Sequence, residues 1–130
     1  MRRALELAKR AQDEGEVPIG ALIVFQEKII GEGWNRPIAA SDPTAHAEIQ
    51  AIRSAAAKTG NYRLSGATLY VTLEPCEMCV GAMFHARIAR AVYGATDPKK
   101  QVLKNQLKLE GGVLSRESGE MLSQFFAARR

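Results

Sequence analysis

The residues best suited to chemistry in this chain form two short motifs. Both cysteines lie three positions apart in the run from Pro75 to Cys79, and about thirty residues earlier His46 is followed two positions later by Glu48. Zinc in proteins is bound mainly by cysteine sulfur and histidine nitrogen, and catalytic zinc sites use three protein ligands with a fourth position left open. The two motifs therefore predict a zinc ion held by His46, Cys76 and Cys79, with the Glu48 carboxylate left over for proton transfer.

The number of available ligands favours a catalytic site over a structural one, which needs four protein ligands. The other histidine, His85, lies nine residues after Cys76. At about 100° per residue it falls on the opposite side of a helix that begins there. The fourth position is therefore expected to hold water, whose pKa zinc lowers towards neutrality. Glu48 is then placed to take a proton from that water and deliver it to a ring nitrogen and a leaving amine, as in hydrolytic deamination of an amidine carbon.

Each motif has other uses when it stands alone. A Cys-x-x-Cys pair also serves as a redox couple or as half of a zinc knuckle, and His-x-Glu by itself is a weak signal. A non-enzymatic, zinc-stabilised binding module would need a fourth protein ligand. The combination of both motifs, with Pro75 directly before the first cysteine, favours the catalytic site, and Met78 and Met83 are expected to pack in the core.

The hydrophobic pattern predicts the elements that must position these residues. Helices are expected at 2–14, from a Thr44 cap to Lys58, at 76–86 and at 117–128. Strands are expected at 20–25, 29–34, 68–72, 89–93 and 107–110, the first two joined as a hairpin, with residues 35–43 as a loop. This order predicts an α/β protein with three α/β/α layers around a central mixed sheet of about five strands.

Both motifs are expected at the starts of helices. A proline in the first turn is well tolerated, so Pro75 suits a helix beginning near Cys76. The positive end of a helix favours thiolate over thiol, and thiolate is the form that binds metal. Two helices whose N-termini point at one spot would hold a zinc ion between them.

Composition limits the class of protein. The 130 residues suffice for one core, so residues 1–130 are predicted to form a single domain. A hydrophobic fraction of 46% with 25% charged residues is ordinary for a soluble protein, and no apolar run reaches the roughly 18 residues of a membrane span. Glu6 and Lys9 interrupt any apolar signal core, so we expect a cytoplasmic location without membrane contact. The net charge of +4 is a weak indication of nucleic-acid binding.

Longer stretches carry a family resemblance. Residues 42–48, 61–64, 69–83 and 87–90 resemble the bacterial tRNA-specific adenosine deaminases of the cytidine deaminase superfamily, and residues 16–20 and 33–37 look like their substrate-side loops. The resemblance covers nearly all of residues 2–97 and the C-terminal helix. Because the His-x-Glu and Pro-Cys-x-x-Cys signature is shared by zinc-dependent nucleobase deaminases in general, the indication of tRNA rests on the flanking segments.

The resemblance implies a cytidine-deaminase-like fold, one zinc ion per subunit, and conversion of the wobble adenosine of a tRNA anticodon loop, or adenosine in other single-stranded nucleic acid, to inosine. It also implies a homodimer whose second subunit helps to complete the RNA site. It assigns zinc binding to His46, Cys76 and Cys79 and proton transfer to Glu48. The substrate-binding residues that it implies are Asn35, Asp97 and Phe126, the backbone N–H groups of Ala47 and Cys76, and Pro18 and Arg36 in the substrate-side loops, with Lys99 and Lys100 near phosphates.

The chain departs from the family pattern after Asp97. The segment from Gly94 to Leu107 is shorter than the family's by roughly a dozen residues, where the family has a glycine-rich stretch and a helix. A parallel crossover normally needs a dozen residues or more, so the last strand either stays parallel through a minimal connection or pairs differently. The competing enzymatic hypothesis is a deaminase of a free base or nucleoside, such as guanine or cytosine, at the same zinc site.

Overall fold

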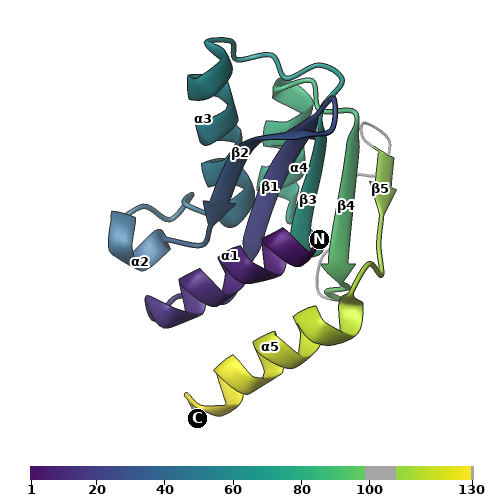
Figure 1. Cartoon of the computed structure of the whole chain (residues 1–130). Coiled ribbons are helices and arrows are strands. Elements are labelled where there is room, and N and C mark those ends of the chain that lie inside the picture. The colour runs from purple at the N-terminus through teal and green to yellow at the C-terminus, as the bar shows by residue number, and fades with distance from the viewer. Residues whose placement is uncertain (99–107, 130) are drawn as a thin grey trace.

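The computed structural model describes residues 1–98 and 108–129, and its centre is a five-stranded sheet in the order β2-β1-β3-β4-β5 (Figure 1). The strands are β1 (Gly20–Phe25), β2 (Lys28–Trp34), β3 (Thr68–Leu73), β4 (Arg90–Ala95) and β5 (Lys108–Glu110). The helices are α1 (Arg2–Asp13), α2 (Pro37–Ala40), α3 (Ala47–Thr59), α4 (Glu77–His85) and α5 (Ser115–Ala127). The mixed sheet expected from the sequence is confirmed, while Lys99, Lys100 and the first residue of the last predicted strand lie outside the described residues.

The sheet contains antiparallel and parallel pairs. β1 runs antiparallel to both of its neighbours, β2 and β3. β3, β4 and β5 are mutually parallel, with Arg90 to Val92 of β4 facing Lys108 to Glu110 of β5. The last strand is therefore parallel, although β4 ends at Ala95 and β5 begins at Lys108. The chain makes this crossover near the minimum length for one.

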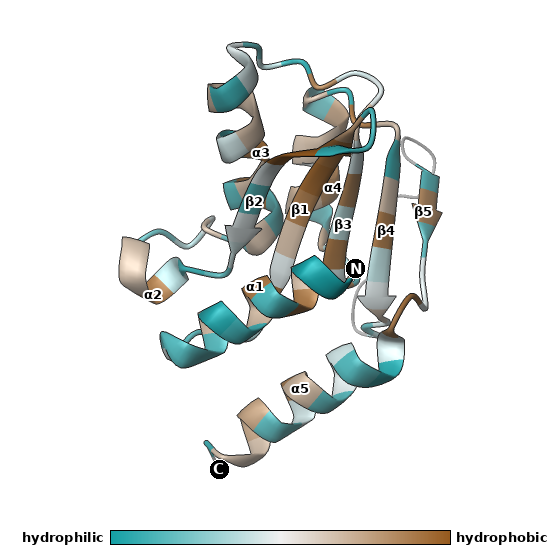
Figure 2. Ribbon diagram, viewed as in Figure 1, coloured by the Kyte–Doolittle hydropathy of each residue, from teal (hydrophilic) through white to brown (hydrophobic). Residues whose placement is uncertain are grey.

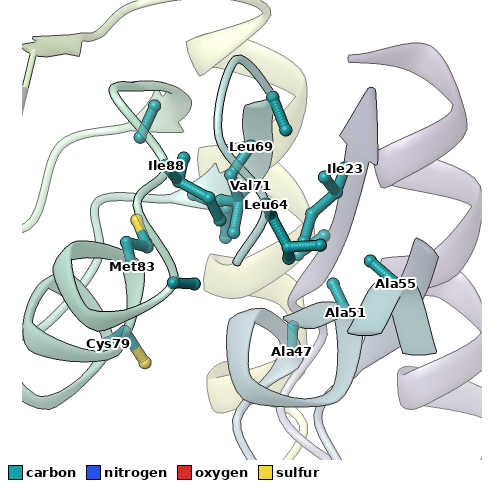
Figure 3. Packing of buried hydrophobic residues seen from close by; sticks show 14 of the residues in the cluster. Ile23, Ala47, Ala51, Ala55, Leu64, Leu69, Val71, Cys79, Met83 and Ile88 are labelled. Carbon is teal, nitrogen blue, oxygen red and sulfur yellow. The ribbon is translucent and has the colours of Figure 1, made fainter. Parts of the chain in front are cut away.

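Helices cover both faces of the sheet, which gives the three predicted layers (Figure 1). On one face, Ile23 and Val71 pack against alanines of α3 and against Cys79 and Met83 of α4 (Figure 3). On the other face, Leu22 of β1 packs against Ala4 and Leu7 of α1. α5 lies on the same side as α1, and Arg2 of α1 forms an ion pair with Glu117 of α5. The hydrophobic colour is strongest on β1 and β3, whereas α1 carries many hydrophilic residues (Figure 2).

α3 approaches the sheet unusually closely. Ala47, Ala51 and Ala55 are fully buried along the side of the helix that faces the sheet. A Cβ atom on Gly33 of β2 would lie 2.4 Å from the carbonyl oxygen of Ala47, and one on Gly31 would lie 2.5 Å from that of Ala51. Side chains of minimal size on both elements therefore fix the position of the helix that begins at the His46 motif.

Two local features between β2 and α3 differ from the sequence-based expectation. α2 interrupts the predicted loop 35–43 as a single helical turn that begins with Pro37. The cap of α3 is His46 rather than Thr44, because the Asp42 carboxylate accepts hydrogen bonds from both the N–H and the hydroxyl of Thr44 (2.8 and 2.7 Å). A local turn of this kind competes with helix capping, and it lowers the pKa of Asp42.

The hairpin between β1 and β2 is confirmed, with a two-residue turn in which Gln26 and Glu27 both have positive φ (49° and 65°). α5 begins at Ser115, two residues before the predicted start. Within the described residues, none of the helices has the length and apolar character needed to span a membrane.

Candidate active site

Both motifs lie at the edge of the sheet where β2, β3 and β4 end. β3 ends at Leu73 and leads into α4, whose cap is Cys76; β2 ends at Trp34 and leads through α2 into α3, whose cap is His46. Both cap residues have extended backbones, with φ and ψ of −71° and 155° for His46 and −78° and 171° for Cys76. The N-termini of two helices therefore meet at one point, as the sequence predicted.

The geometry of His46, Cys76 and Cys79 suits a zinc ion. Nδ1 of His46 lies 3.6 Å from Sγ of Cys76 and 3.5 Å from Sγ of Cys79, and all three atoms lie within 4.8 Å of one another. A tetrahedral zinc ion with Zn–S near 2.3 Å and Zn–N near 2.1 Å separates nitrogen and sulfur by about 3.6 Å. The three side chains are therefore already spaced to hold the metal.

The thiols show which protonation state the site favours. The hydrogen bond with Cys79 lowers the pKa of Cys76 to about 4 despite its burial, and His46 contributes in the same direction. The same hydrogen bond, together with burial and the nearby Glu48 carboxylate, raises the pKa of Cys79. Cys76 therefore forms the thiolate that binds metal more readily than Cys79, and zinc binding would displace the proton of Cys79.

Glu48 lies beside this group without belonging to it. It occupies the first turn of α3 and is 4% exposed. Its carboxylate is near enough to the Cys79 thiol to raise the pKa of that thiol. Among the described residues, however, the cluster of potential ligands consists of His46, Cys76 and Cys79. His85 is exposed on α4 and stacks edge-on against Phe84, with the ring centroids 5.9 Å apart. The role of Glu48 as proton carrier remains a prediction.

Asn35, directly after β2, contacts the start of α3. Its Oδ1 accepts a buried hydrogen bond of 2.9 Å from the backbone N–H of Ala47, so the amide NH2 is the end that remains to donate to another molecule. This differs from the expectation that the Ala47 N–H faces the substrate, because Asn35 satisfies that free N–H at the start of α3. Contacts of Asn35 and Ala47 with substrate remain predictions.

The other predicted substrate residues surround this edge of the sheet at different depths. Pro18 is fully buried. The guanidinium of Arg36 lies 3.7 Å from Glu14 and 5.8 Å from the centre of the Trp34 ring, outside the metal cluster. Phe126 of α5 is 49% exposed, whereas the adjacent Phe125 is buried.

Sequence reasoning missed two buried carboxylates. Oε1 of Glu74, directly before Pro75, accepts the backbone N–H of Asp97 at 2.9 Å and so ties the end of β4 to the start of α4. Glu16 accepts the N–H groups of Ile38 and Ala39 in α2. Both glutamates lie within two residues of a buried proline, but nothing in the sequence indicates which distant backbone groups they contact.

Comparison with known proteins identifies the family. Residues 1–95 match the family model described as the cytidine and deoxycytidylate deaminase zinc-binding region. A tRNA-specific adenosine deaminase of Haemophilus influenzae is 50% identical, with 100% of this chain and 83% of that protein covered. This chain belongs to the tRNA-specific adenosine deaminases of the cytidine deaminase superfamily. The cofactor of this deaminase family is zinc, in agreement with the His-Cys-Cys geometry.

Solved structures support the assignment. One from a study of A-to-I editing by tRNA:A34 deaminases at the wobble position of transfer RNA is 42% identical, covers 94% of this chain and 97% of its own, and has a TM-score of 0.89. A guanine deaminase from Bacillus subtilis is 34% identical, covers 98% and 90%, and has a TM-score of 0.69. The alignment with the Haemophilus deaminase spans 143 positions, 13 more than the 130 residues of this chain. This difference agrees with the expected shortening by roughly a dozen residues.

Proposed function

We propose that this protein, acting as a single deaminase domain, hydrolyses adenosine to inosine at the wobble position of a tRNA anticodon. The observation that carries this proposal is the group of one imidazole nitrogen and two sulfurs at zinc-binding distances, with the buried Glu48 beside it. The net reaction consumes one water and releases one ammonia for each adenosine. The relatives named above supply the expected substrate, because tRNA-specific adenosine deaminases are similar to this chain over its whole length.

Metal binding, proton transfer and orientation of the substrate are assigned to different residues. His46, Cys76 and Cys79 hold the metal, and bound zinc supplies the positive charge that makes water nucleophilic near neutral pH. Glu48 accepts one proton of the attacking water and delivers it to the purine ring nitrogen. It then carries the proton of the newly added hydroxyl to the amine, which leaves as ammonia while the ring carbon becomes a carbonyl. The NH2 group of Asn35 orients the nucleoside, since its Oδ1 is already held by Ala47. Burial of Glu48 keeps competing water away from this transfer.

A single-stranded loop is the form of substrate that fits such a site. A base must leave its stack to reach buried catalytic groups, and the unpaired bases of an anticodon loop are already near this state. Arg36, which directly follows Asn35 and lies 3.7 Å from Glu14, is partly exposed, and we propose that its positive charge contacts the phosphates. We further propose that Asp97, whose N–H donates to Glu74, contacts the sugar of the extruded nucleotide, and that the half-exposed Phe126 contacts the RNA further out.

The test is an ammonia-release and inosine assay on an anticodon stem-loop, with free adenosine, guanine and cytidine in parallel. We expect turnover on the stem-loop and little on the free compounds. Turnover on guanine or cytidine alone would support the competing hypothesis. Glu48→Ala is the matched control: zinc content should stay at one per chain while deamination is lost. Loss of zinc would instead make Glu48 a ligand.

We also propose that the enzyme is a homodimer that works in the cytoplasm, where tRNA substrates are modified. Support comes from the outer side of α4, where Met78 and Phe84 are 39% and 38% exposed and Gly81 between them has open space around the position of a side chain. Because Cys76 caps α4, a second copy packed here would lie next to the site. Light scattering should give twice the chain mass for the wild type and a monomer for Phe84→Asp.

A further inference from the structure

A buried carboxylate outside the catalytic group holds α2 in place. Glu16 is 2% exposed, and its two carboxylate oxygens accept the backbone N–H groups of Ile38 (3.3 Å) and Ala39 (2.8 Å). These N–H groups belong to the first turn of α2, where a helix has no acceptors of its own. The cap residue, Arg36, makes no capping hydrogen bond through its side chain. Since a four-residue helix has almost no intrinsic stability, the Glu16 contacts are its main anchor.

α2 lies in a loop that connects Asn35, directly after β2, with His46, at the start of α3. The loop leaves β2 at Asn35, whose N–H donates to the Ile19 carbonyl, and it reaches α3 at His46. The N–H of Arg36 donates to the carbonyl of Ala45 at 2.9 Å, which closes the loop one residue before His46. Glu16 reaches this loop from the segment after α1, which lies beside α2 (Figure 1). Removing Glu16 would leave the ends of the loop held by these backbone hydrogen bonds. The α2 turn in the middle of the loop would lose its hydrogen bonds to Glu16.

The surface of α2 is unusual for a segment anchored in this way. None of its residues is buried, and Ile38 is 76% exposed, the highest exposure among the large hydrophobic side chains of the described residues. An apolar side chain held next to an active site can bury its surface against the exposed face of an unstacked nucleobase. The adjacent Arg36 adds a positive charge for the phosphate.

We propose that Glu16 is a positioning residue that holds α2 as a fixed rim of the active site, from which Ile38 and Arg36 contact the nucleotides flanking the target adenosine. This inference rests on the proposed function, because the partner of the rim is the RNA substrate. Glu16 itself touches neither zinc nor substrate. Its loss should weaken RNA binding and leave the chemical step and the metal site largely intact.

The experiment compares Glu16→Ala and Glu16→Gln with the wild type on an anticodon stem-loop. Leu64→Val is the control, since it alters a buried side chain just before β3, at the opposite end of the sheet from the site. Each zinc-loaded protein is measured for melting temperature, zinc content, KM and kcat, and for hydrogen exchange at the Ile38 and Ala39 amides. In a Glu48→Ala background, direct binding of the stem-loop gives a readout that does not depend on turnover.

Loss of both hydrogen bonds in Glu16→Ala should raise KM and the dissociation constant for the stem-loop about tenfold, with kcat within about threefold of wild type. The two amides should lose protection, and zinc should remain at one per chain. Glu16→Gln keeps one acceptor and should fall between Glu16→Ala and the wild type. Leu64→Val should lower the melting temperature without changing KM.

Two results would overturn the inference. If the amides lose protection but KM stays at the wild-type value, α2 does not contact the RNA. If Leu64→Val raises KM as much as Glu16→Ala at the same loss of melting temperature, Glu16 acts only through global stability. A wild-type protein that fails to deaminate the stem-loop would be a failure of the proposed function instead, which keeps the two outcomes distinguishable.

Discussion

The close contact between β2 and the first turn of α3 predicts that Gly33→Ala disables the enzyme more than it destabilises the fold. The added methyl carbon would lie 2.4 Å from both the carbonyl oxygen of Ala47 and the backbone nitrogen of Ala51. Non-bonded heavy atoms prefer separations near 3.5 Å, so the first turn of α3 must retreat by about 1 Å. Overpacking of this kind costs about 1–3 kcal/mol of unfolding free energy.

The catalytic loss follows from the position of Ala47 between His46 and Glu48. A shift of about 1 Å in a catalytic group can reduce the rate about 100-fold, so we expect kcat/KM to fall by about 10- to 100-fold. Gly31→Ala is the matched comparison. Its Cβ would lie 2.5 Å from the Ala51 carbonyl, one turn further along α3 and away from the metal ligands. A similar loss of stability with a smaller loss of activity is expected there.

The assay combines thermal unfolding, zinc content and inosine formation for both variants and for Gly119→Ala. The last substitution lies on α5, where nothing lies within 4 Å of the added carbon, so it should be neutral or raise stability by up to about 1 kcal/mol. Equal activity losses in Gly31→Ala and Gly33→Ala would refute the reasoning, since the losses would then follow stability rather than displacement of the catalytic turn. Wild-type activity in Gly33→Ala would refute it as well.

Three further predictions test the fold and the metal site. Glu27→Gly should raise the free energy of unfolding by about 1 kcal/mol, because Glu27 adopts φ 65° in the hairpin turn and a left-handed conformation costs a non-glycine residue about that much. Denaturant unfolding measures this change, and a lower unfolding free energy would contradict the prediction. The double hydrogen bond from Arg3 lowers the pKa of Glu32, so this pair adds stability above the unfolded pKa of about 4.5 that is lost as pH falls through the lower folded value. Arg3→Ala should therefore flatten the acid limb of the stability curve by less than about 1 kcal/mol, since both side chains are partly exposed. Chelation of zinc should abolish turnover and lower the melting temperature reversibly, since a metal at 1,000 times its dissociation constant adds about 4 kcal/mol to the free energy of unfolding. An unchanged melting temperature would argue against a preformed His46–Cys76–Cys79 site.

The sequence alone determined the chemistry and most of the elements. The residue types and spacing of His46, Cys76 and Cys79 predicted the metal, and the opposite direction of His85 left three ligands. The hydrophobic pattern placed all five strands within one or two residues of their observed starts among the described residues. These features depend on local spacing and on side-chain chemistry, which are properties of short stretches of chain.

The tertiary structure decided what depends on contacts between distant segments. The direction of β5 depended on whether a short connection allows a parallel crossover, which no local pattern specifies. The capping of α3 shifted from Thr44 to His46 because Asp42 competed for the threonine. Asn35 turned out to hold the Ala47 N–H, 12 residues away in sequence, and Glu16 to hold α2 across 22 and 23 residues. Hydrogen bonds between remote backbone and side-chain groups form only after the sheet and helices have brought them together, so the arrangement around the catalytic residues is a property of the folded chain.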